Sequence, residues 1–196
     1  MRVFRRRRER GQSLVEFAVV IPVLLTLVLV IAEFGVLFST NMSMVEATSA
    51  GSRVGAILVN GSNSLGSCGL TGYQNVDPQI MLTVQRVVES PGSGINPAYI
   101  DWVDIYDSTS TGGEGAYNRW TYKAGGGGTV CGVTLDFILK STNWLASSRG
   151  NTLPVDSIGV LIQYEYHLFT PISAVTHLFG AGTITVVDST VAAFEP

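Results

Sequence analysis

The sequence predicts an α+β protein in which one long N-terminal transmembrane-plus-stalk α-helix precedes a small antiparallel β-sheet head domain. Three observations predict this layout. An uncharged apolar run lies near the amino terminus, eighteen of the 22 glycines lie beyond residue 60, and several later segments alternate apolar and polar residues. The chain has 196 residues, 46% hydrophobic and 14% charged, which suits about one domain and excludes disorder throughout.

Charge is distributed unevenly along the chain. Six of the twelve Lys and Arg residues lie among the first ten positions, together with one acidic residue, Glu9. From Gln12 onward, six basic residues accompany fourteen acidic ones, a formal balance of −8. This acidic part of the chain would repel the phosphates of nucleic acids, because proteins bind these phosphates with clustered Lys and Arg. Nucleic acid is therefore not expected as a partner.

The apolar run follows the basic block closely. Residues Phe17–Ala32 carry no charge and are bounded by Glu16 and Glu33, which a helix would separate by about 25 Å. Both carboxylates can therefore lie near opposite faces of a hydrocarbon layer about 30 Å thick. A buried core helix is the alternative, but the arginines obey the positive-inside rule and would serve no purpose in a core. A secretory signal would have a shorter apolar region and a small-residue cleavage site. We expect a single membrane pass.

A short motif joins the basic block to the apolar run. Gly11 follows the arginines, and Glu16 is the fifth residue after it. This arrangement resembles the class III leader of type IV prepilins. The chain is similar to the TadE-like pilus assembly proteins, which are small pseudopilins of the Tad (Flp) pilus. The similarity lies in residues 11–18, in Pro22 inside the helix and in residues 33–35 at its far end. The resemblance covers about residues 8–59, where a stretch rich in small residues continues the family pattern.

The resemblance implies that a membrane-embedded prepilin peptidase cuts between Gly11 and Gln12. Glycine lets an extended backbone enter a narrow protease site, and the cut removes the arginines that hold the helix on the cytoplasmic side. The pilin residue that resembles Glu16 is thought to meet the amino terminus of a neighbour. A glutamate that simply touches water at the membrane edge is the alternative. The other implied partners are the major Flp pilin, sibling pseudopilins, the inner-membrane assembly platform and membrane lipid.

The helical pattern continues beyond the membrane segment. We expect helix from Leu14 to about Val59, ended by the turn-forming residues 60–64, with Glu33 as a cap at the outer membrane surface. Small residues recur at every fourth position and allow another backbone to approach closely. This ladder of small residues comprises Ser43, Ala47, Gly51 and Gly55. It could pack on the chain's own sheet or contact another subunit, and the sequence favours neither alternative.

The head domain shows the pattern of one short helix and several strands. Asp77-Pro78 can cap a helix that ends at Val88, with an apolar stripe at Ile80, Val84, Val87 and Val88. Strands are expected at residues 98–107, 119–123, 157–167 and 183–192, with a short helix or turn at 172–179 and a flexible glycine loop at 125–128. The helix followed by antiparallel strands is the layout of pilin-like heads, by analogy with the resembling family.

Two cysteines lie in the head. A disulfide between Cys68 and Cys131 is geometrically allowed outside the cytoplasm and would contribute about 4 kcal/mol in the chain-entropy model. Two buried free thiols are the alternative. No metal site or cofactor is expected, because His167 and His177 lack ligand spacing and no C-x-x-C is present.

Catalytic signals are also missing from the sequence. It contains no G-x-S-x-G or H-E-x-x-H motif, and the glycine loop lacks the frame of a phosphate-binding loop. The acids Asp101, Asp104 and Asp107 are expected to be solvated, on different sides of a strand. We therefore expect a protein that is not an enzyme.

These observations give one organisation and two candidate functions. Residues 1–11 form a basic leader, 12–38 a transmembrane helix, 39–60 its extracytoplasmic extension and 61–196 a β-rich extracytoplasmic head. The first function is a TadE-like minor pilin or pseudopilin of the cytoplasmic membrane that is incorporated into a pilus or primes it. The second is an uncleaved single-pass protein whose outer domain binds a ligand or envelope component.

Overall fold

The computed structural model describes residues 6–63, 68–109, 111–150, 156–170 and 183–194. The chain divides into two compact units. One comprises Met1–Leu37 and His167–Thr183, and we call it the membrane-helix unit. The other comprises Phe38–Tyr166 and Ile184–Pro196, and we call it the sheet unit.

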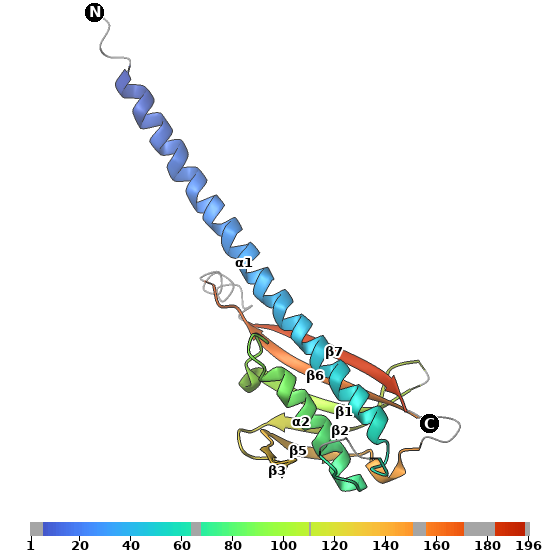
Figure 1. The fold of residues 1–196 in the computed structure, drawn as a ribbon. Coiled ribbons are helices and arrows are strands. Elements are labelled where there is room, and N and C mark those ends of the chain that lie inside the picture. Colours follow the sequence, from blue (N-terminus) through green and yellow to red (C-terminus); the bar gives the residue numbers. More distant parts are fainter. Residues whose placement is uncertain (1–5, 64–67, 110, 151–155, 171–182, 195–196) are drawn as a thin grey trace, which may run out of the picture. The chain divides into compact units, whose positions relative to one another are not determined.

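Helix α1 runs without a break from Arg6 to Leu58 and contributes to both units (Figure 1). It begins eight positions before the expected start at Leu14, so that boundary was wrong. The reason is that arginine is a good helix former, and a helix already nucleated by the apolar run extends into the basic block. The helix ends where Val59 adopts a left-handed φ of 50°, and Gly61 follows with a φ of 84°.

Gly61 allows the chain to turn closely after α1. The Gly72 N–H donates to the Gly61 carbonyl at 2.8 Å. A Cβ on Gly61 would lie 2.6 Å from the Tyr73 nitrogen, so a side chain cannot be accommodated there. The chain then passes through a 3₁₀ turn, Tyr73–Asn75, into helix α2, Val76–Val88.

The expected apolar stripe of α2 forms the buried side of that helix. Ile80, Val84 and Val88 are fully buried, whereas Val87 is half-buried at the edge of the stripe. The helix begins one residue before the expected Asp77, which lies in its first turn.

The sheet unit contains a five-stranded sheet with the order β5-β2-β1-β6-β7. Pairings of β1 with β2, β1 with β6 and β2 with β5 are antiparallel. The strands are β1 Ile100–Ser108, β2 Glu114–Tyr122, β5 Phe137–Thr142, β6 Ser157–His167 and β7 Thr183–Ala193, and a separate short hairpin joins β3 Thr129–Val130 and β4 Val133–Thr134.

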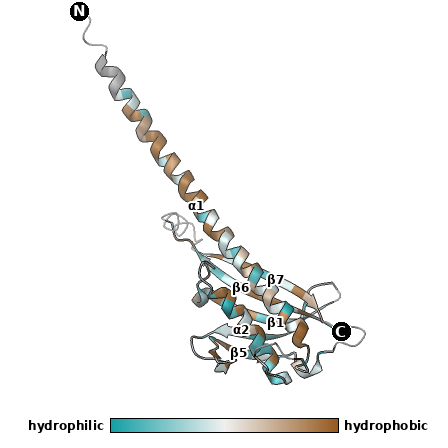
Figure 2. Ribbon diagram, viewed as in Figure 1, coloured by the Kyte–Doolittle hydropathy of each residue, from teal (hydrophilic) through white to brown (hydrophobic). Residues whose placement is uncertain are grey.

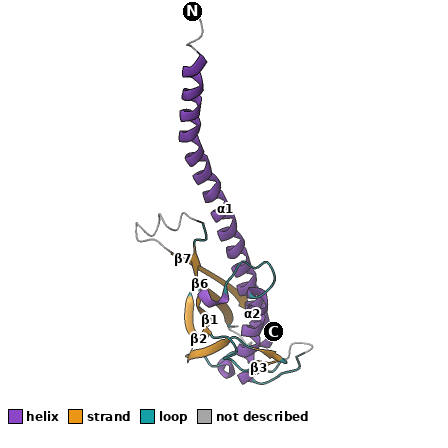
Figure 3. Ribbon diagram, turned by 90° about the vertical axis from the view of Figure 1, so that its left-hand side faces the viewer, coloured by secondary structure: helices purple, strands orange, loops and turns teal. Residues whose placement is uncertain are grey.

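Both helices of the sheet unit lie on one face of the sheet (Figure 3). The strand residues on this face are fully buried in β1 and β6, namely Val103, Ile105, Ile158, Val160 and Ile162. The expected β6 is confirmed residue for residue, and β1 and β7 differ from expectation by two residues or fewer at each end. Strand β2 starts five positions earlier than expected, and β3, β4 and β5 were not foreseen, because their short runs carry little alternation. The segment expected at 172–179 lies outside the described residues.

Candidate functional site

The expected cleavage bond lies inside a helix. Gly11 and Gln12 are exposed residues of α1, and a Cβ added to Gly11 would meet no atom within 4 Å. Proteases bind extended backbone, so several residues around this bond would have to leave the helix before cleavage. Glycine lowers the cost of this step, since it destabilises a helix interior by about 0.5–1 kcal/mol relative to alanine.

Glu16 lies one turn after Gln12 on the same side of α1. The Gln12 side-chain amide donates to the Glu16 carboxylate at 3.0 Å, and both residues are exposed. The carboxylate therefore has a hydrogen-bond donor within its own chain at the membrane edge. Its contact with the amino terminus of a neighbour stays a prediction.

The membrane-helix unit exposes a continuous apolar surface. Among the described residues, one helix is long and apolar enough to cross a membrane, Gly11–Leu58, and its most apolar eighteen-residue window is 0% buried. Figure 2 shows this stretch as the brown part of α1. A core helix of a globular protein would be buried over this length, so the exposed surface fits a single-pass membrane anchor.

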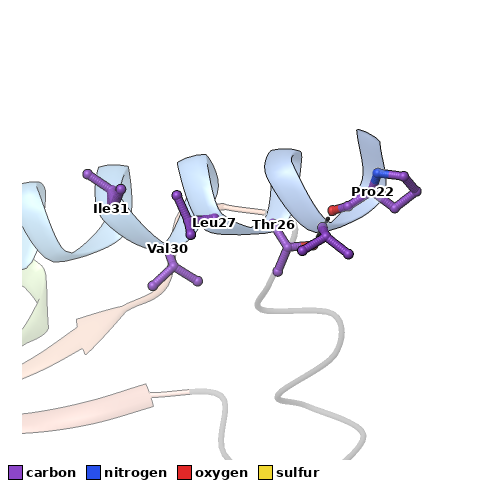
Figure 4. A pocket seen from close by; sticks show the side chains of 6 residues that line it. Pro22, Thr26, Leu27, Val30 and Ile31 are labelled. Atoms are coloured by element: carbon purple, nitrogen blue, oxygen red, sulfur yellow. Dashed lines mark hydrogen bonds between the residues drawn. The ribbon is translucent and has the colours of Figure 1, made fainter. Parts of the chain in front are cut away.

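Part of this apolar surface is hollowed next to a proline (Figure 4). Helix α1 continues through Pro22, and the Thr26 hydroxyl donates to the Pro22 carbonyl at 2.8 Å, which keeps this polar side chain satisfied in an apolar setting. The described residues that line the hollow are uncharged: Pro22, Val23, Thr26, Leu27, Val30 and Ile31. Such a surface suits lipid chains or a second helix.

Glu33, the expected cap at the outer membrane surface, is a buried residue. Its exposed fraction is 6%, and its two carboxylate oxygens accept hydrogen bonds from the backbone N–H groups of Phe169 at 3.2 Å and Thr170 at 3.0 Å. These partners belong to the same unit and follow β6 directly. A buried carboxylate needs such donors, because its charge is costly to desolvate without them. The sequence offered one signal, a charge that interrupts an apolar run.

The ladder of small residues in α1 lies in the sheet unit, and its inner members pack against that unit. Ala47, Gly51 and Gly55 are buried, and Ser43 is half-buried. A Cβ on Gly51 would lie 2.8 Å from Val84 of α2, and one on Gly55 would lie 2.6 Å from Ile158 of β6. Of the two readings left open, the structure gives these glycines a role within the chain's own core.

We predict that Gly55→Leu lowers the free energy of unfolding by about 1–3 kcal/mol, because the added side chain overlaps Ile158 and Ile80. Urea unfolding of the full-length protein in detergent, followed by tryptophan fluorescence, measures this effect. Gly35→Leu is the matched control, since Gly35 is exposed and a Cβ there meets nothing within 4 Å. An unchanged midpoint for Gly55→Leu combined with lost pilus assembly would instead assign this glycine to a contact between subunits.

A disulfide joins Cys68 and Cys131. Cys68 follows α1 and precedes α2, whereas Cys131 lies between β3 and β4 with a φ of 52°. The bond thus fixes the short hairpin to the segment that links the two helices.

The sheet carries an ion pair between a buried acid and a half-buried arginine that the sequence did not suggest. Asp104 was expected to be solvated, but it is 0% exposed and pairs with Arg119 of β2 at 2.5 Å. The expectation was wrong because register places the two residues directly opposite each other on neighbouring strands. The rings of Trp102 and Tyr117 lie 4.4 and 4.9 Å from the guanidinium carbon of Arg119.

Other acids near the ends of the strands have raised pKa values. Burial raises the pKa of Glu114, and the charge of Asp104 adds to it. Burial and the charge of Asp156 likewise raise the pKa of Asp107, which is half-buried, whereas Asp101 is exposed as expected. Within the described part of the chain, no group of three or more His, Cys, Asp or Glu side chains could hold a metal ion. His167 is exposed, and His177 lies outside the described residues.

The protein has a pilin-like α+β layout, in which a long apolar helix precedes an antiparallel sheet, and the exposed apolar half of this helix fits a single-pass membrane anchor. The family model described as "TadE-like protein" matches residues 11–53, so the chain carries a TadE-like segment, and the resemblance seen in the sequence is confirmed. The match covers the anchor and most of the buried part of α1 and leaves the strands outside it. Neither the comparison with curated proteins nor that with solved structures gives a match.

Proposed function

We propose that this protein is a TadE-like minor pilin or pseudopilin, a structural component that a Tad (Flp) type IV pilus needs for its assembly. The main support for the proposal is that Gly11, Glu16 and an exposed apolar helix occur together inside the segment that matches the TadE-like family. In this proposal the protein is not an enzyme and needs no cofactor.

The proposed life cycle begins in the cytoplasmic membrane. The basic leader stays in the cytoplasm, α1 crosses the bilayer and the sheet unit lies outside the cytoplasm. A prepilin peptidase then cuts after Gly11 and removes the arginines. Without these charges the helix is free to leave lipid for contacts with the major Flp pilin and sibling pseudopilins, on the inner-membrane assembly platform.

Sequencing of the amino terminus tests this proposal. Protein from the native host should begin at Gln12, and protein made without the peptidase should keep residues 1–11. A chain that keeps its leader while the pilus machinery is intact would contradict the proposal.

The second candidate is an uncleaved single-pass protein whose outer domain binds a ligand or envelope component. One observation favours it, namely that the Gly11–Gln12 bond lies within α1 rather than in extended backbone. The same sequencing experiment separates the two candidates.

We predict that Glu16→Ala is cut normally but enters the pilus poorly. Removal of the carboxylate takes away the group that would pair with a neighbour's new amino terminus, while Gly11 and Gln12 are kept and only the Gln12 side chain loses a hydrogen bond. Immunoblots of sheared pili and of membranes measure incorporation and processing separately. Val15→Ala is the control, because it truncates an exposed neighbouring side chain and leaves Gly11, Gln12 and Glu16 unchanged. Wild-type incorporation of Glu16→Ala would mean that the carboxylate only meets water.

A further inference from the structure

Two backbone N–H groups bring the segment after β6 to the end of the apolar part of α1. The Phe169 and Thr170 amides donate to the two carboxylate oxygens of Glu33, and all three residues belong to the membrane-helix unit. Glu33 directly follows the uncharged run Phe17–Ala32. Phe169 is therefore held at the level where this run ends.

The Phe169 side chain is left uncovered at this level. It is 59% exposed, whereas the following Thr170 is 3% exposed. Phe34, the next residue of α1 after Glu33, is 66% exposed. Two large aromatic side chains are thus exposed beside the end of the anchor. Exposure of such apolar surface to water is unfavourable.

The surrounding sequence suits contact with lipid. No Asp, Glu, Lys or Arg occurs between Glu165 and Asp188. The carboxylate of Glu33, the group whose charge would oppose such contact, is 6% exposed and accepts hydrogen bonds at both oxygens. Its charge is therefore shielded by the same contact that fixes Phe169.

From this arrangement we propose that Leu168–Thr170 forms a second membrane contact, in which Phe169 enters the outer boundary between headgroups and acyl chains of the bilayer that α1 spans. Glu33 is the positioning residue, because its carboxylate fixes the backbone of this segment. We favour a lipid bilayer as the partner of Phe169, because this side chain continues the apolar surface of the anchor helix. The inference rests on the proposed membrane insertion of α1.

Site-specific labelling of the full-length chain tests the proposal. Cys68 and Cys131 are bonded to each other, and the chain has no other cysteine, so one introduced cysteine is a unique reactive thiol. We would make Phe169→Cys, Leu25→Cys and Tyr73→Cys, attach a fluorophore and place one chain in each lipid nanodisc. Nitroxide groups on the lipid headgroups and on the acyl chains then report depth by quenching.

The label at position 169 is expected at a shallow depth, about 5–10 Å into the bilayer, and quenched most by the headgroup probe. The label at position 25 should be quenched most by the acyl-chain probe. The label at Tyr73, which is 57% exposed in the sheet unit, should be quenched by neither. Glu33→Ala in the Phe169→Cys background should abolish quenching at position 169.

The outcomes separate this inference from the proposed function. An unquenched label at position 169 together with a deeply quenched label at position 25 would overturn the second contact and leave the anchor standing. An unquenched label at position 25 would overturn the membrane insertion itself. Unchanged quenching in Glu33→Ala would remove the positioning role of Glu33.

Discussion

Gly11→Arg is expected to abolish removal of the leader, so that the whole population of the protein keeps residues 1–11. Two effects act in the same direction. The long charged side chain cannot enter a protease site that accepts glycine, and arginine stabilises a helix interior by about 0.5–1 kcal/mol relative to glycine, which opposes unwinding of α1 around the bond. The variant should remain in the membrane fraction and form no pilus.

This experiment is informative because the substitution should not disturb the fold. A Cβ at Gly11 would meet no atom within 4 Å, so loss of processing cannot be attributed to a clash within the chain. Intact-mass measurement on protein from a host that contains the peptidase gives the processed fraction. Gly35→Ala, a second uncrowded glycine of α1, is the control and should be processed like the wild type. A mature chain starting at Gln12 in Gly11→Arg would show that the cut does not depend on this glycine.

Much of the fold could be predicted from the sequence, because its elements have strong local periodicity. The buried side of α2 and the whole of β6 follow from apolar spacing within one segment. The start of α1 could not be placed, since arginine and the apolar residues both favour helix and no cap separates them. The hairpin of β3 and β4 was not predicted, because strands of two residues are too short to show an alternating pattern.

The candidate site was predictable only where its residues are neighbours in sequence. Gly11, Gln12 and Glu16 lie within one and a half helical turns. The surroundings of Glu33 depend on Phe169 and Thr170, more than 130 residues later, and those of Asp104 on a partner in the next strand. The sequence showed each carboxylate but not the donors that bury it, so Asp104 was expected in water and the burial of Glu33 was not predicted.

A buried ionic cluster in the sheet unit was missed for the same reason. Arg149 is 2% exposed and donates to Asp77 of α2 at 2.6 Å. Asn118 of β2 donates to the other Asp77 oxygen at 2.6 Å, and the Arg149 guanidinium carbon lies 4.1 Å from the Trp144 ring. The cluster therefore connects α2, β2 and the segment after β5.

We expect Arg149→Ala to lower the free energy of unfolding by about 3–5 kcal/mol, the largest stability effect predicted for this chain, because it leaves the Asp77 carboxylate buried without its cation. Urea unfolding of the full-length protein in detergent measures the change. The double variant Asp77→Ala and Arg149→Ala should lose less than the sum of the single variants, since no uncompensated charge remains. Arg86→Ala, which truncates an exposed arginine of α2, should stay within about 0.5 kcal/mol of the wild type. Equal effects for Arg86→Ala and Arg149→Ala would show that the Asp77 charge is already compensated by Asn118 and solvent, and that the ion pair does not hold α2 to the sheet.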